Sequence, residues 1–227
     1  MTPRPTPRAA PFLLAVLAVA GCSGPAGPQA ASPRPAPAST AALEAIYRAR
    51  VDSARTRHTA ADVAFMTGMV GHHAQALVMA AMAPTHGASP EVQRLAARID
   101  NAQRDEIATM QRWLRDRGQP VPEVHISGTT LMVHGAGGHT DHAGMPGMLT
   151  PDQLDELDGA RGAAFDRLFL TYMIQHHGGA VVMVDTLFAS DGAAQDEEAF
   201  KLASDVQVDQ RTEIARMQRM LDALPAP

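Results

Sequence analysis

Residues 62–79 read DVAFMTGMVGHHAQALVM, and residues 166–183 read DRLFLTYMIQHHGGAVVM. At an offset of 104 residues, nine of these 18 positions are identical, among them both histidines. A second pair follows at an offset of 107 residues: residues 103–114 read QRDEIATMQRWL, and residues 210–221 read QRTEIARMQRML. Apolar periodicity alone would not repeat the Asp, His, Gln and Glu letters as well. The chain is therefore expected to contain a duplicated two-helix unit.

Capping and stop signals place helices around both copies. The expected helical stretches cover about 41–55, 59–84, 89–118, 150–189 with a break near Gly159, and 193–223. The loop within each copy is short, whereas a long segment joins the copies. These features predict an all-α fold, namely a ferritin-like four-helix bundle with a long His/Met-rich crossover loop. The expected domain covers residues 42–224, with repeat 1 at about 59–117, the insert at about 118–150 and repeat 2 at about 151–223.

The first 41 residues have the composition of an export signal followed by a tether. A short apolar run at 12–20 follows two arginines and is too short to span a bilayer as a helix. Residues 19–22, VAGC, match the small-residue pattern before a lipid-modified cysteine. We expect residues 1–21 to be a lipoprotein signal peptide, and residues 22–41 to be the lipidated Cys22 and a flexible tether rich in Ala and Pro. A plain secretory signal with a chance cysteine is the alternative.

Composition narrows the class of protein further. A lipoprotein signal would leave the folded part in the cell envelope, held at a membrane and facing the periplasm or the extracellular side. Cys22 is the sole cysteine, which excludes a disulfide framework and a Cys-based zinc site. A net charge of −5 argues against a nucleic-acid-binding protein. An aromatic content of 4% favours helices over a β-rich fold.

Each repeat places one carboxylate on the apolar stripe of its second helix, Glu106 in the first copy and Glu213 in the second. A carboxylate in an apolar environment is costly unless it is paired or binds a metal. The paired histidines lie on the apolar faces of the first helices. They are His72 and His73 in the first copy and His176 and His177 in the second.

Two interpretations of these polar residues remain open. In the first, each Glu accepts an N–H from a histidine of the partner helix, and a buried polar network holds the helices together. In the second, His, Met and Glu side chains bind a metal, with each Glu either a ligand or the group that orients a ligating His. Single methionines are more typical of core packing than of ligation. Met69 and Met173 are the stronger candidates, because each lies one turn before a histidine pair. The chain contains no Glu-x-x-His motif, so a di-iron site is not expected.

The insert carries a second group of soft ligands, with four His and three Met among residues 125–148. Its core at 134–148, HGAGGHTDHAGMPGM, is expected to be neither a helix nor a core strand. Thioether and imidazole groups without thiolate suit Cu(I) or Ag(I), and imidazole also suits Cu(II) and Zn(II). The candidate ligands are His134, His139, His142, Met145 and Met148. A flexible linker of coincidental composition, or Met145 and Met148 as a plug at one end of the bundle, are the alternatives.

The two copies of F-x3-M-x2-HH-x2-A-x2-M, each followed by Q-x2-EI-x2-M, together with the intervening GMPGM and the downstream FDRLFL, resemble the domain-of-unknown-function 305 family over residues 62–221. The resemblance implies a ferritin-like helical bundle and export, and some members are implicated in binding copper or silver and in copper resistance. The ligands that it implies are His72, His73, Met69 and Met79 in the first copy, His176, His177, Met173 and Met183 in the second, and Met145 and Met148 in the insert. Gly178 and Gly179 replace Ala74 and Gln75, so the two sites need not be equivalent.

These observations lead to one expected function and one alternative from another class. The first is an exported, membrane-tethered protein that binds copper, with Cu(I) as the leading candidate and silver or zinc as others, for sequestration, tolerance or transfer to a copper exporter or chaperone. The alternative is a metal-free envelope scaffold or interaction protein whose His–Glu pairs are structural. No set of nucleophile, base and orienting residue is visible, so an enzyme is not expected.

Overall fold

The computed structural model describes residues 39–55, 57–135 and 144–225 of the 227-residue chain. The expected signal peptide, Cys22 and most of the expected tether lie outside the described residues, as do His139 and His142. The elements are α1 (Thr40–Arg55), α2 (Ala60–Met82), α3 (Pro90–Asp116), β1 (Glu123–Ser127), β2 (Thr130–His134), α4 (Pro151–Gly159), α5 (Gly162–Phe188) and α6 (Glu197–Asp222).

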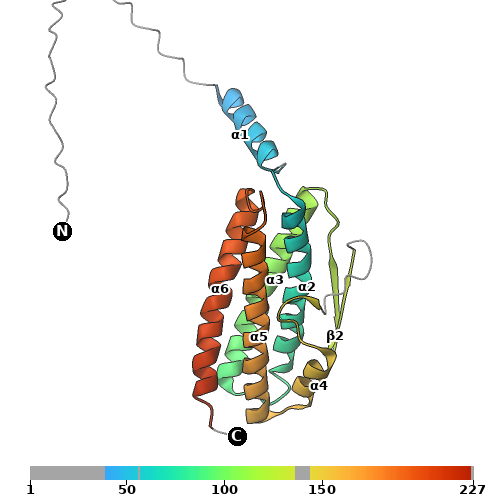
Figure 1. Ribbon diagram of the computed structural model, residues 1–227, viewed down its shortest axis with the longest axis vertical. Coiled ribbons are helices and arrows are strands. Elements are labelled where there is room, and N and C mark those ends of the chain that lie inside the picture. Colours follow the sequence, from blue (N-terminus) through green and yellow to red (C-terminus); the bar gives the residue numbers. More distant parts are fainter. Residues whose placement is uncertain (1–38, 56, 136–143, 226–227) are drawn as a thin grey trace, which may run out of the picture. The chain divides into compact units, whose positions relative to one another are not determined.

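Two helical pairs, α2 with α3 and α5 with α6, form the bundle, and α2 packs against α5 between the pairs (Figure 1). This is the predicted ferritin-like bundle made of a duplicated two-helix unit. The helix starts follow from their caps. Thr59 and Asp62 form the predicted capping box of α2, and Ser89 caps α3 ahead of its first-turn proline. The predicted break near Gly159 separates α4 from α5.

The repeat-related residues Asp62 and Asp166 tie each half of the bundle to the other. Asp62, in the first turn of α2, accepts the N–H of Ala194 in the loop after α5 at 2.7 Å. Asp166, near the start of α5, accepts the N–H of Ser89 in the loop after α2 at 3.1 Å. Since each carboxylate reaches the loop that ends the opposite helix, α2 and α5 run antiparallel.

Among the described residues, a β-hairpin in the insert is the regular element that the all-α expectation missed. β1 and β2 pair antiparallel, with Val124 opposite Val133 and Ile126 opposite Leu131. The two connecting residues begin with Gly128, whose φ of +59° is favourable for glycine and matches the first position of a type II′ turn. The alternation of polar and apolar residues along 123–127, just before this glycine, was the local signal for the hairpin.

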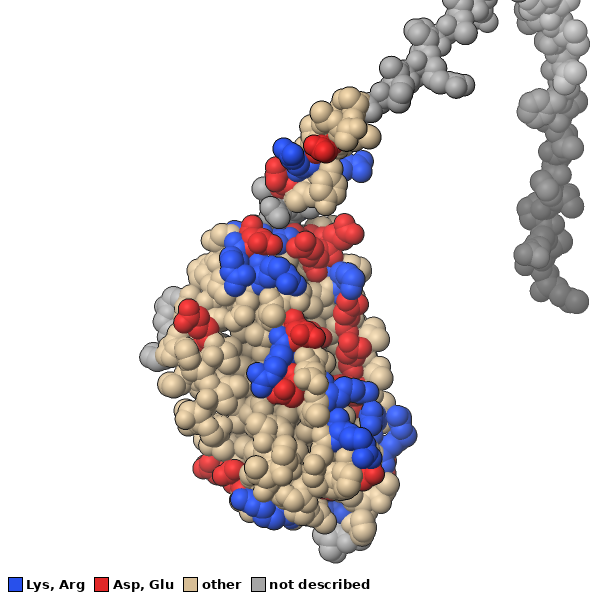
Figure 2. All heavy atoms as spheres, turned by 180° about the vertical axis from the view of Figure 1, so that it is seen from behind, with Lys and Arg blue, Asp and Glu red and all other residues tan. Residues whose placement is uncertain are grey.

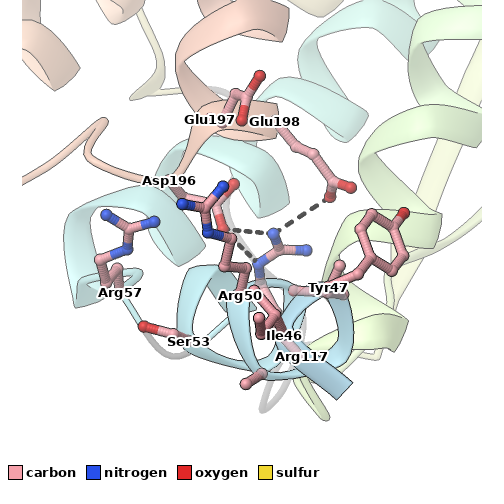
Figure 3. Close-up of a pocket in the computed structure, with 11 residues that line it drawn as sticks. Ile46, Tyr47, Arg50, Ser53, Arg57, Arg117, Asp196, Glu197 and Glu198 are labelled. Atoms are coloured by element: carbon pink, nitrogen blue, oxygen red, sulfur yellow. Dashed lines mark hydrogen bonds and ion pairs between the residues drawn. The ribbon is translucent and has the colours of Figure 1, made fainter. Parts of the chain in front are cut away.

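A buried ion pair joins the end of α3 to the start of α6. Figure 3 shows the guanidinium of Arg117 between Asp196 and Glu198. Asp196 also accepts the indole N–H of Trp113 at 3.2 Å and caps α6 through the N–H of Ala199 at 3.0 Å. Burial acts to raise the pKa of Asp196, but the hydrogen bonds from Arg117, Ala199 and Trp113 outweigh it and hold that pKa below its usual value. On the face shown in Figure 2, basic and acidic side chains lie intermixed.

This ion pair gives a stability prediction. Asp196→Ala should lower the free energy of unfolding by about 3 kcal/mol, because it leaves the Arg117 guanidinium buried without its main partner. Glu198→Ala is the matched control, since that carboxylate is 70% exposed and should contribute less than about 1 kcal/mol. Urea denaturation of both variants measures the difference, and equal losses would show that Arg117 does not depend on Asp196.

Candidate metal centre

The four paired histidines form one buried cluster where α2 crosses α5. His72 and His73 come from α2, His176 and His177 come from α5, and all four are 0% exposed. The ring centroids of His72 and His176 are 4.0 Å apart, and the rings within each pair are 6.4 and 6.2 Å apart. The duplication therefore brings all four imidazoles together between the two halves of the bundle.

The outer two imidazoles donate to carboxylates from the second helix of their own repeat. His73 Nε2 lies 2.8 Å from Glu106 Oε2, and His177 Nε2 lies 2.7 Å from Glu213 Oε2. Glu213 also accepts a hydrogen bond from Arg98 at 3.0 Å. These are the His–Glu contacts of the first interpretation above. They also leave each Glu in position to orient a ligating histidine.

The inner two imidazoles donate to backbone carbonyls. His176 Nε2 lies 2.9 Å from the carbonyl oxygen of His72, and His72 Nε2 lies 3.0 Å from the carbonyl oxygen of Pro146. A carbonyl oxygen only accepts, so both rings carry their proton on Nε2. Their Nδ1 atoms then hold a free lone pair. In the described part of the chain, Nδ1 has no hydrogen-bond partner in any of the four rings.

Burial keeps His72, His176 and His177 uncharged. Burial, and secondarily the nearby His73, lowers the pKa of His72 to about 3, and burial together with the neighbouring histidines places the pKa of His176 well below 6.5. Burial also lowers the pKa of His177, although Glu213 opposes the shift. The His177–Glu213 contact is therefore a neutral N–H donating to a carboxylate. Neutral imidazole is the form that binds a metal, so these rings need not lose a proton first.

Two methionine side chains end beside the cluster at Gly68. Met145 Sδ and Met183 Cε each lie 3.4 Å from the position that a Cβ would take at Gly68. Side chains in a helix lean toward its N-terminus, so His72 lies over the turn that begins at Gly68. Both methionines are partly exposed, unlike the fully buried ones described below. The second repeat has Tyr172 where the first has Gly68, so the space for two thioethers exists in one half only.

The segment that carries Met145 is fixed in place by a second difference between the repeats. Gln75 pairs with the backbone of Leu149 through both ends of its amide, at 3.0 and 2.7 Å. The equivalent position in the second repeat is Gly179, where a Cβ would lie 1.9 Å from the carbonyl oxygen of Pro146. Gly147 adopts a φ of +75° at this close approach. The aligned residues thus have different roles: Gln75 holds the segment by hydrogen bonds, and Gly179 leaves room for it.

The remaining predicted ligands lie in different places. Met69, Met79 and Met173 are fully buried in the core, and Met148 is 9% exposed beside the Gln75-bound segment. His134 lies on β2 and is exposed. The insert therefore divides its soft ligands between the hairpin and the bundle. Gly68 and Gln75 were not predicted as site residues, although both differ from the aligned residues of the second repeat, Tyr172 and Gly179.

Within the residues that the structure describes, no three His, Cys, Asp or Glu side chains are arranged to hold one ion. An ion at the cluster would therefore need thioether ligands beside one or two imidazoles. The free Nδ1 lone pairs and the converging Met145 and Met183 fit such a mixed set. Low-coordinate soft ions, rather than hard ones, match these donors.

The duplicated bundle with its buried histidine pairs defines a class of helical proteins with internal two-fold repetition. The chain belongs to the family described as Domain of unknown function (DUF305), whose model matches residues 62–221. It is similar to a DUF305 fragment from Deinococcus radiodurans, with 32% identity, 74% of this chain and 99% of that chain covered, and a TM-score of 0.60. No curated protein matches this chain.

Two further solved structures are similar to it. A putative secreted DUF305 protein from Streptomyces coelicolor shares 26% identity, with 71% of this chain and 92% of that chain covered and a TM-score of 0.58. CopM in its Cu(I)-bound form shares 29% identity, with 71% of this chain and 95% of that chain covered and a TM-score of 0.52. CopM was also solved in Cu(II)-bound and Ag-bound forms.

The buried histidines predict how stability depends on pH. Unfolded His72 takes up a proton below its ordinary pKa of 6.5, whereas folded His72 stays neutral down to about pH 3. The unfolded state then binds more protons, so lowering the pH from 6.5 toward 3 should destabilise the metal-free protein. The loss is about 1.4 kcal/mol per pH unit for this one ring.

Urea denaturation at pH 5, 6 and 7 measures that slope. His72→Gln should reduce the slope by this amount, because the variant lacks the titrating ring. His125→Gln is the control for the loss of a histidine outside the cluster, since 58% of the His125 side chain is exposed. An unchanged slope in His72→Gln would contradict the assignment of a buried neutral ring.

Proposed function

We propose that this protein is an exported, membrane-tethered protein that binds Cu(I) or Ag(I) through imidazole and thioether ligands. The observation that carries the proposal is the unpartnered Nδ1 lone pair of His72, one helical turn from the converging side chains of Met145 and Met183. The likeness to CopM, solved with Cu(I), Cu(II) and Ag bound, supports it.

The charge state of the site favours a monovalent soft ion. The inner rings are neutral and the thioethers carry no proton, so binding releases no proton from these groups even in acid. Glu106 and Glu213 are not metal ligands in this proposal. Each carboxylate accepts a hydrogen bond from Nε2 of His73 or His177, so its negative charge is separated from the inner pair of histidines by one imidazole ring. A metal held here would be bound cargo for sequestration, tolerance or transfer. A binding role, rather than catalysis, also agrees with the absence of a nucleophile motif from the sequence.

The metal-free scaffold remains the second candidate, and a specific observation favours it. All four Nε2 atoms already have oxygen partners without any metal. Such a network is sufficient to fix the contact between α2 and α5. The scaffold would, however, give no role to the buried Nδ1 of His72, whereas a bound metal would use it. That difference is the reason for preferring metal binding.

Export and membrane attachment rest on the N-terminal sequence and on the secreted relative. Residues 12–22 match a lipoprotein signal that is cleaved before Cys22, and the similar Streptomyces protein is described as a putative secreted protein. Among the described helices, none has the length and apolarity needed to cross a membrane. Attachment would then depend on the lipid. A copper exporter or chaperone is the expected delivery partner.

Replacing both thioethers at Gly68 tests the metal site. Met145→Leu with Met183→Leu should weaken Cu(I) binding by at least about tenfold, since even groups that only orient ligands typically contribute 10–100-fold in affinity. Met220→Leu is the control, because Met220 is also partly exposed but lies on α6. The measurement is a Cu(I) titration against a competing chelator at pH 7 and pH 5. An unchanged affinity for Cu(I) in the double variant would contradict the proposed metal site and favour the scaffold role.

Cys22→Ser tests the membrane attachment. The variant cannot carry the lipid, so it should appear in the soluble envelope fraction while the parent protein stays with the membranes. Fractionation after a high-salt wash makes the comparison. Ser23→Ala serves as the control that keeps the cysteine. A variant that stays in the membrane fraction after the wash would contradict the lipoprotein interpretation.

A further inference from the structure

The outer face of the β-hairpin gathers two imidazoles and a thioether that the sequence separates. His125 on β1 lies opposite Met132 on β2, and Glu123 lies opposite His134. Alternation along both strands puts these four side chains on one face. The ring centroids of His125 and His134 are 5.6 Å apart, and Glu123 Oε2 lies 3.9 Å from His125 Nε2. His134 was predicted as a ligand together with residues of the loop that follows, and His125 was not among the predicted ligands.

The opposite face of the hairpin holds this arrangement against the bundle. Val133 is 6% exposed, and Val124 and Leu131 pack against the hydrophobic core. The side-chain amide of Gln111 on α3 donates to the carbonyl oxygen of Pro122, just before β1, at 2.8 Å. The outer residues are therefore carried on a fixed platform, which lowers the entropy lost when they share a ligand.

We propose that this outer face is a binding site for a divalent copper ion, with the imidazoles of His125 and His134 as ligands and the thioether of Met132 beside them. The site goes beyond the soft-metal site of the bundle and does not depend on it. It would give the protein separate places for the two oxidation states of copper. Neither the similar proteins nor the repeated motifs point to a role for this face.

The ring separation suits one shared ion. An imidazole nitrogen binds at about 2.0–2.1 Å, so the ion lies about 3.2 Å from each ring centre. Two such rings have centroids about 4.5 Å apart at a right angle and about 6.4 Å apart when they are opposite. The observed 5.6 Å falls inside this range.

The donor set selects Cu(II) over other divalent ions. Among first-row ions, Cu(II) binds nitrogen and oxygen donors most tightly, and it prefers a tetragonal site with weak axial ligands. Two imidazoles with water in the plane, and the Met132 thioether as a weak axial group, meet that preference. Since the described residues hold no group of three His, Cys, Asp or Glu around one point, Zn(II) lacks the closed tetrahedral set that it favours.

A Cu(II) titration of the purified protein, followed by electron paramagnetic resonance, tests the site. The parent protein should show one bound Cu(II) with splitting from two nitrogen ligands. His125→Gln with His134→Gln should lose that signal, while its thermal unfolding stays the same because both rings lie on the outer face. His139→Gln with His142→Gln is the matched control, since it removes two imidazoles from the same insert, and it should keep the signal.

Two further variants separate this site from the bundle. Met145→Leu with Met183→Leu should keep the two-nitrogen signal, because the hairpin does not use those thioethers. Met132→Leu should keep both nitrogens but shift the spectrum as the axial group changes. Retention of the signal in His125→Gln with His134→Gln would overturn the proposal. Loss of the signal in His139→Gln with His142→Gln, alone or together with the hairpin variant, would overturn it as well, because the ligands would then come from the loop.

Discussion

Four buried imidazoles inside an apolar bundle are the constraint on which the rest of this structure depends. The N–H group of each ring needs a hydrogen-bond acceptor, and each ring donates from Nε2 to an oxygen atom of another element. Glu106 and Glu213 supply two of these oxygens from α3 and α6. Backbone carbonyls of His72 and Pro146 supply the others. The same bonds fix the tautomer and leave Nδ1 as the open donor atom; the bond from His176 joins the two repeats, and the bond from His72 joins the first repeat to the insert.

The two copies of the duplicated unit differ at positions that determine where the insert packs. Gly68 leaves space for two methionine ends, whereas Tyr172 fills the matching position and donates a hydrogen bond to Glu156. Gln75 binds the backbone of the insert, whereas Gly179 lets the insert approach. A symmetric bundle would exclude the segment from both sides or admit it at both. The differences thus place one thioether-lined site on one side of the histidine cluster.

Much of the fold could be read from the sequence, because duplication and helix caps are local patterns. The Asp62 capping box and the break near Gly159 follow from neighbouring residues, and both are confirmed. The hairpin also has a local sequence signal, but the glycine-rich segment that follows it led to the prediction that the whole insert is a loop. The convergence of Met145 on Gly68 was beyond sequence reasoning, since it depends on a contact between residues far apart in the chain. Its only trace was the glycine in place of the aligned tyrosine.

The most direct test of the account is the ¹⁵N spectrum of the histidine side chains during a titration with Ag(I), which is redox-inert under these conditions. Before metal is added, the buried rings should show protons on Nε2 and unprotonated Nδ1. One equivalent of Ag(I) should move the Nδ1 resonance of His72 while its Nε2 keeps its proton and its bond to Pro146. Binding of Ag(I) without any change at His72, or with a proton moved from Nε2 to Nδ1, would contradict the account.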